Sequence, residues 1–150
     1  MTPTLQAERT LTVAAVEQLV TDWYAALDRH DPLDEVLPML VSDGLTMHLP
    51  ETTLHGLDGF RSWYEAVTHR FFDETHTLTS LDIRLGDGPS AEVKVVVNWQ
   101  TTVWKAPAPT SEWLGFDAYQ TWTVSLEDGA ARIRTYSVDA LAPMAGSGSL

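Results

Sequence analysis

Histidine is the side chain in this sequence best suited to moving protons at neutral pH, because an unperturbed imidazole titrates at about pH 6.5. The chain has five histidines and no cysteine, which excludes thiolate nucleophiles, disulfides and zinc–thiolate sites. His48 lies in an alternating segment, on the face opposite Met47, and could abstract or deliver a proton there. Alternatively, His48 has only a structural role and is hydrogen-bonded in the core or at the rim. His76, which begins a predicted strand, is the second candidate acid or base.

An amide and several aromatic rings could complete a site for a small molecule. Gln120 lies between Ala118 and Trp122 on one face of a predicted strand, where its amide could orient a carbonyl or a water. Alternatively, Gln120 has only a structural role and its amide is hydrogen-bonded to the backbone. Aromatic side chains supply flat apolar area with a polar tip. The candidate wall residues, each of which could equally be core, are Trp23, Tyr64, Trp99, Trp122 and Tyr136.

Motifs for nucleotides, serine nucleophiles and metals are missing. GxGxxG, GxxxxGK followed by Ser or Thr, GxSxG and HExxH do not occur, so the sites that they build are not indicated. The pairs His48 and His55, and His69 and His76, are not spaced to bind one metal from a helix face. His30, His55 and His69 lie near turns or helix ends, and we assign them no role. We expect no cofactor and no metal.

The net charge of the chain indicates which classes of partner are disfavoured. Twenty-one acidic residues against nine basic ones give a net charge of -12, and such a field repels nucleic acid and anionic lipid alike. No segment has the roughly 20 consecutive apolar residues that span a bilayer. Residues 1–12 are polar where a secretory signal would be apolar. We therefore expect neither nucleic acid nor membrane as a partner, and a cytoplasmic location.

Three helices and a set of strands must position these side chains. Apolar residues recur at three- and four-residue spacing over 13–29, Asp31-Pro32 begins a short second helix that ends near Asp43-Gly44, and a third helix follows Gly56. Between the second and third helices, residues 45–50 alternate as a strand. After residue 76 the period becomes twofold, which predicts four strands at about 76–85, 91–104, 112–125 and 131–141.

Short turns join the last four strands: Asp87-Gly88, the proline loop at 106–109 (Ala-Pro-Ala-Pro) and Asp128-Gly129. We therefore expect these strands to pair antiparallel as a meander. Helices laid over one face of such a sheet make an α+β domain. We place this single domain at residues 13–142, between a flexible N-terminus (1–12) and a flexible Gly/Ser tail (143–150). Trp104 and Trp113 flank the proline loop and are assigned to a dimer contact or a lid, with surface packing as the alternative.

Four segments carry a characteristic order of helix, turn and strand patterns: WYAALDRHD (23–31), VSDGLTMHLP (41–50), LHGLDGF (54–60), and YQTWTV (119–124) followed by Asp128-Gly129 and Arg132-Ile133. In this order the chain resembles the nuclear transport factor 2-like superfamily, and within it the SnoaL-like polyketide cyclases and ketosteroid isomerases. The resemblance covers nearly the whole chain and is more specific for the fold than for the reaction.

The resemblance implies a cone-shaped, curved antiparallel sheet around three N-terminal helices, with a pocket inside and often a homodimer through the outer sheet face. It also places His48 inward, where the isomerases have a carboxylate base. Trp23 stands where they have a tyrosine, and Gln120 where they have an acid. These differences remove the oxyanion donors of steroid enolisation and argue against plain ketosteroid isomerase activity.

The leading hypothesis is a cofactor-independent lyase, isomerase or cyclase that acts on a small hydrophobic, polyketide- or terpenoid-like molecule. His48 would be the general acid or base, and Gln120, together with Tyr136, would bind the oxygen on which charge develops. The first alternative is a non-catalytic ligand-binding or dimerisation module of the same fold. The second is an epoxide hydrolase, which the missing Asp-Arg-Asp constellation disfavours.

Overall fold

The computed structural model describes residues 10–150 of the chain. Its helical part contains α2 (Val13–Arg29), α3 (Leu33–Val36), the short 3-10 segment η1 (Leu37–Met39) and α4 (Gly56–Arg70). Its strands are β1 (Thr46–His48), β2 (Thr53–His55), β3 (Phe71–Leu85), β4 (Ser90–Val103), β5 (Glu112–Glu127) and β6 (Ala130–Pro143). Residues 1–9, most of the N-terminus predicted to be flexible, lie outside the described residues.

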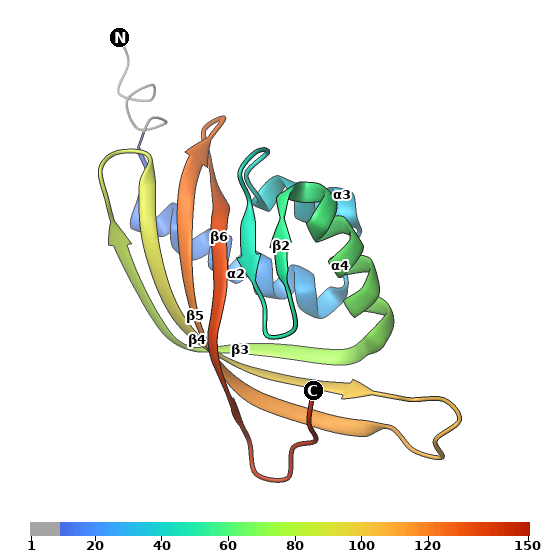
Figure 1. Cartoon of the computed structure of the whole chain (residues 1–150). Helices are drawn as coiled ribbons and strands as arrows, with labels where there is room; N and C mark the ends of the chain where they lie inside the picture. Colours follow the sequence, from blue (N-terminus) through green and yellow to red (C-terminus); the bar gives the residue numbers. More distant parts are fainter. Residues whose placement is uncertain (1–9) are drawn as a thin grey trace.

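Within residues 10–150 the strands form one six-stranded sheet in the order β2-β1-β6-β5-β4-β3. The four long strands are an antiparallel meander, as the sequence predicts. They curve around α2, α3 and α4, and the sheet does not close into a barrel (Figure 1). The α+β cone expected from the sequence is therefore confirmed.

Helix α2 lies across the concave face of this sheet (Figure 1). Thr12 caps its start, where the side-chain hydroxyl accepts a hydrogen bond from the backbone of Ala15 at 3.1 Å. The predicted apolar stripe is buried, with Trp23 fully enclosed. The helix ends at His30, which adopts the left-handed conformation (φ 52°) and donates its backbone N–H to the carbonyls of Ala26 and Leu27.

Two boundaries and one additional strand are the main differences from the sequence prediction. The second helix ends at Met39 rather than near Asp43, because Pro38 cannot donate the backbone bond that would continue an α-helix. A second short strand, β2, pairs with β1 across a tight hairpin. Strand β3 begins at Phe71 rather than His76, because α4 passes straight into extended backbone there (φ -103°, ψ 144°).

A β-bulge near the start of β3 decides which side chains face inward. Phe72 pairs with Thr102 and Thr75 pairs with Gln100, so β3 holds one extra residue in this interval. Asp73 absorbs it with a left-handed conformation (φ 51°). Beyond the bulge, the side chains of Glu74 and His76 lie toward the concave side of the sheet.

The C-terminal segment, predicted to be a flexible tail, lies along β5. The backbone N–H of Gly148 donates to the carbonyl of Trp113 at 3.2 Å. The hydroxyl of Ser147 accepts from the backbone N–H of Gly115 at 2.9 Å. Leu150 thereby reaches the rim of the cavity described below. Among the described residues, no helix is long and apolar enough to cross a membrane.

Candidate active site

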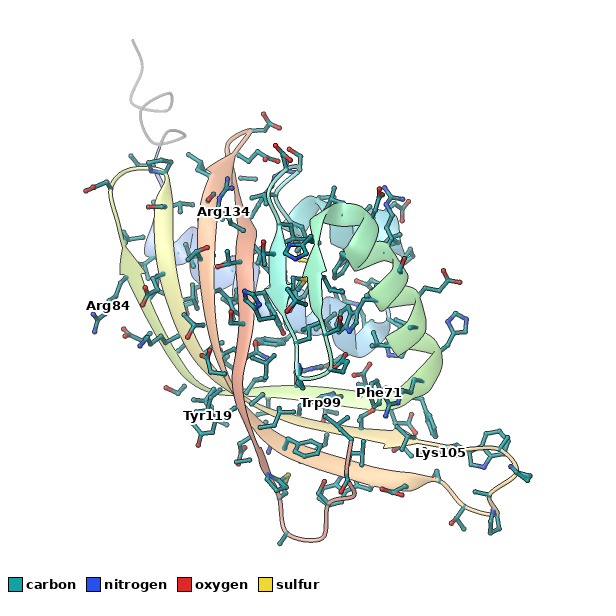
Figure 2. The ribbon with its side chains drawn as sticks, in the orientation of Figure 1. Phe71, Arg84, Trp99, Lys105, Tyr119 and Arg134 are labelled. Carbon is teal, nitrogen blue, oxygen red and sulfur yellow. The ribbon has the colours of Figure 1, made fainter. Side chains whose placement is uncertain are left out.

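A cavity of about 290 Å³ lies between the concave face of the sheet and the helices. Its wall is mostly apolar, with side chains from α2, α4, the β1–β2 hairpin and β3 to β6. Trp99 of β4 lies beside Phe71 at the point where β3 leaves α4 (Figure 2), with 5.2 Å between their ring centroids. The polar side chains that line the cavity include His30, Tyr64, Glu74, His76, Gln120 and Tyr136.

His76 forms a close pair with Asp28 of α2. The ring nitrogen Nδ1 lies 2.6 Å from Asp28 Oδ1, and the backbone N–H of His76 donates to Oδ2 at 3.1 Å. A carboxylate can only accept hydrogen bonds, so Nδ1 carries the proton and Nε2 of the neutral ring has a lone pair. The imidazole also stacks between Tyr24 at 5.2 Å and Trp99 at 6.1 Å. These contacts fix both its tautomer and its orientation.

Gln120 is held in one orientation by two buried donors. Its Oε1 accepts from the Tyr24 hydroxyl at 2.7 Å and from Trp122 Nε1 at 3.1 Å. With the oxygen occupied in this way, the amide nitrogen is the group that Gln120 can offer to the cavity. Beside it, burial raises the pKa of Tyr136 to about 12, so this phenol stays protonated at neutral pH and can donate a hydrogen bond.

A second histidine and carboxylate pair lines the same cavity. His30 Nε2 lies 2.5 Å from Glu74 Oε2, and the other oxygen of Glu74 accepts from Trp99 Nε1 at 3.0 Å. Tyr64 closes this side, and its hydroxyl donates to the carbonyl of Asp31 at 2.6 Å. Burial, with the nearby charges of Asp31 and Glu74, raises the pKa of Tyr64 to about 12. Among residues 10–150, no cluster of three or more His, Asp or Glu side chains is arranged to hold a metal ion.

Comparison with known proteins identifies the family. The model of the SnoaL-like domain matches residues 8–137. The chain belongs to the SnoaL-like domain family. This confirms the resemblance drawn from the sequence. A search of curated proteins finds no match.

Solved structures share the fold of this SnoaL-like domain at low sequence identity. One, from Novosphingobium aromaticivorans and provisionally named a scytalone dehydratase, is 18% identical, with a TM-score of 0.71 over 91% of this chain and 88% of that one. The hexachlorocyclohexane dehydrochlorinase LinA-type3 of Novosphingobium barchaimii is 16% identical, with a TM-score of 0.72 over 91% and 92%. A Nostoc punctiforme protein of unknown function with a cystatin-like fold is 16% identical, with a TM-score of 0.66 over 94% and 99%.

His48 does not face the cavity of this SnoaL-like domain, so the expectation of an inward His48 was wrong. It is exposed on the β1–β2 hairpin, with Nδ1 3.3 Å from the hydroxyl of Thr53. Strand β1 turns its apolar side inward, where Met47 is fully buried and Leu45 nearly so. Because side chains alternate along a strand, burying Met47 sends His48 outward.

The other predicted site residues divide into two groups. The structure brings His76, Gln120, Tyr64, Trp99 and Tyr136 together around the cavity. Trp23 and Trp122 are fully buried and do not line it. They pack behind Tyr136, at ring distances of 5.7 Å and 5.2 Å, so they support the wall rather than form it.

Sequence reasoning missed Asp28, His30 and Glu74. Asp28 lies one helical turn after the buried Tyr24, and an acid at that spacing on the inward face of a helix is a signal that could have identified it. The placement of His30 and Glu74 depends on two left-handed residues, His30 itself and Asp73. No pattern of apolar spacing indicates either of these conformations.

Proposed function

We propose that this SnoaL-like domain is a cofactor-independent lyase or isomerase that removes a proton from carbon in a small hydrophobic substrate. The observation that carries the proposal is the His76–Asp28 pair at the wall of an apolar cavity. Nε2 of His76 is the base, and Asp28 holds the ring in the required tautomer and stabilises the imidazolium that forms. This pair takes over the role that the sequence hypothesis gave to His48.

The oxygen that gains negative charge as the proton leaves needs hydrogen-bond donors. Gln120 offers its amide N–H and Tyr136 its hydroxyl, and both residues line the same cavity as His76. Donors that are fixed in a water-poor site stabilise developing charge without having to reorganise. The acidic carbon therefore lies next to a carbonyl or an equivalent oxygen, and the reaction requires neither metal nor organic cofactor.

The wall favours a small, largely apolar molecule. Aromatic and aliphatic side chains surround the polar groups, and the ring of Trp99 lies beside His76. Two proteins of similar structure are named for a dehydratase and a dehydrochlorinase. Both names describe eliminations, which begin with removal of a proton from carbon or pass through that step. Elimination is thus the reaction class that we favour.

Exchange of carbon-bound hydrogen tests the base without knowledge of the natural substrate. Benzylacetone in D₂O, followed by proton NMR, should exchange its α-hydrogens in the presence of the protein. His76→Gln should lower the catalysed rate about 10²–10⁴-fold, and Asp28→Asn should lower it as well. His48→Gln is the matched control and should leave the rate unchanged, because His48 is exposed on the hairpin.

If a folded His76→Gln protein exchanges benzylacetone as fast as the unmodified protein, the catalytic proposal is wrong. Continued binding of benzylacetone by that variant would then support the non-catalytic binding module. Circular dichroism of each variant checks that it is folded.

We further propose a homodimer formed through the convex face of the sheet. Alternation along β5 turns Leu114, Ala118 and Gln120 inward and leaves Trp113 and Tyr119 on the other face, 37% and 46% exposed. Tyr119 points away from the helices (Figure 2). Large exposed apolar side chains on one face of a sheet are typical of an interaction surface.

A further inference from the structure

The cavity holds a second histidine and carboxylate pair that the proposed base does not use. His30 Nε2 meets Glu74 Oε2 at 2.5 Å, and the side chains of His30 and Glu74 are only 25% and 10% exposed. The other oxygen of Glu74 accepts from Trp99 Nε1 at 3.0 Å. Both Glu74 oxygens are therefore engaged, so Glu74 is placed to orient His30 rather than to act on a ligand itself.

The backbone on both sides of this pair adopts an uncommon conformation. The described residues have three non-glycine residues in the left-handed region, and two of them, His30 and Asp73, place this pair. The third, Asp128, lies in the turn between β5 and β6. A left-handed conformation costs a residue with a β-carbon roughly 1–2 kcal/mol, and such conformations persist where their surroundings hold them and often at functional sites.

Trp99 links the two pairs. Its ring face stacks on His76 at 6.1 Å, and its N–H donates to Glu74. A molecule in the cavity beside Trp99 thus has His76 and the His30–Glu74 pair in the same wall. Since Glu74 only accepts, Nε2 of His30 carries a proton, and Nδ1 is the atom that can exchange a proton with a ligand.

The two pairs differ in their surroundings. His76 is the more enclosed, with a side chain 10% exposed between two stacked rings, which suits a neutral base. His30 lies nearer the rim, next to the ion pair of Arg29 with Asp31. When His30 is protonated, Glu74 balances its positive charge. This arrangement suits a proton donor that regains its proton from solvent after each reaction.

We propose that His30, positioned by Glu74, is the general acid that protonates a departing oxygen, so that the site takes substrates with a hydroxyl β to the carbonyl. This inference rests on the proposed function. The C–H bond breaks and its proton goes to His76 Nε2, while the C–O bond breaks and the leaving oxygen takes the proton of His30 Nδ1. The products are an unsaturated carbonyl compound and water. Proton exchange with solvent then restores both histidines, so no co-reactant is consumed.

Three related probes separate the acid from the base. Benzylacetone exchanges its α-hydrogens and needs only a base. Its β-chloro derivative also needs only a base, because chloride leaves without a proton. Its β-hydroxy derivative needs an acid as well, because hydroxide is a poor leaving group. Appearance of the conjugated product is followed by absorbance, with the uncatalysed rate subtracted.

His30→Gln should slow dehydration of the β-hydroxy derivative about 10²–10⁴-fold, and should change proton exchange and chloride loss less than about threefold. Glu74→Gln should lower dehydration selectively but by a smaller factor. His69→Gln is the matched control and should change none of the three rates, because this side chain is exposed at the end of α4 and bonds to the carbonyl of Glu65.

Equal losses with all three probes in His30→Gln would show a structural role and overturn the proposal. Unchanged dehydration in that variant would overturn it as well. So would an unmodified protein that exchanges benzylacetone but does not dehydrate its β-hydroxy derivative; in that case the proposed function still stands. Failure of the proposed function is a separate result, seen as full proton exchange in His76→Gln.

Discussion

Gln120 has a structural role beside the chemical one proposed for its amide. Gln120→Leu removes the amide donor and also leaves the Tyr24 hydroxyl and Trp122 N–H without their acceptor. Each unsatisfied buried donor costs about 1–3 kcal/mol, so we expect the free energy of unfolding to fall by at least that amount. Urea denaturation measures the change.

The matched control for this prediction is Gln18→Leu on the exposed face of α2, where the side chain bonds only to Asp22. Its effect should stay within about 0.5 kcal/mol. Equal stabilities for the two variants would show that Tyr24 and Trp122 do not depend on Gln120.

The sequence predicted part of the site at this scale. Gln120 was predicted from strand alternation, Trp99 and Tyr136 from residue type, and His76 from its place at the start of a predicted strand; all four line the cavity. His48 was misplaced because its inward orientation came from the family pattern, whereas the apolar side of β1 carries Met47. Partners from distant elements, such as Asp28 for His76, depend on tertiary packing that local spacing does not encode.

Among the elements, strand β3 contains the bulge after which the side chains of Glu74 and His76 face the cavity. Asp73 adopts φ 51° there, a conformation that glycine accepts readily and β-branched residues do not. We therefore expect Asp73→Gly to be at least as stable as the unmodified protein and Asp73→Val to be roughly 1–2 kcal/mol less stable. Thermal or urea unfolding measures the order.

Asp82, on the regular part of the same strand, provides the comparison. It is exposed and pairs with Lys94. In extended backbone valine is favoured over glycine, so the order of the two substitutions should reverse at this position. The same order at both sites would mean that the left-handed conformation of Asp73 does not decide its stability.

Most elements of the fold were predictable, because apolar periodicity and turn residues mark them. The four long strands and their antiparallel order followed from the switch to a twofold period and from Asp87-Gly88 and Asp128-Gly129. Strand β2 was missed because three residues are too few to show alternation. The start of β3 was missed because no glycine or proline separates it from α4.

For the whole molecule, the convex face of the sheet gives a testable assembly. Light scattering during gel filtration should give twice the chain mass for the unmodified protein. Tyr119→Glu should give one chain mass, because it puts a charge into the proposed apolar contact. Val13→Glu is the control and should remain dimeric, because Val13 is equally exposed, at 46%, but begins α2 rather than lying on the sheet. A monomeric unmodified protein, or a dimeric Tyr119→Glu, would contradict the proposed dimer.

The parallel pairing of β1 with β6 has a consequence for the order in which the molecule is assembled. Met47 pairs with Tyr136, and Thr46 with Thr135, so during synthesis β1 cannot pair with β6 until residues 135 and 136 have been made. Asp28 and His76 have both been synthesised long before then. A nascent chain therefore contains both residues of the proposed proton-transfer pair before it contains the Tyr136 side of the surrounding wall.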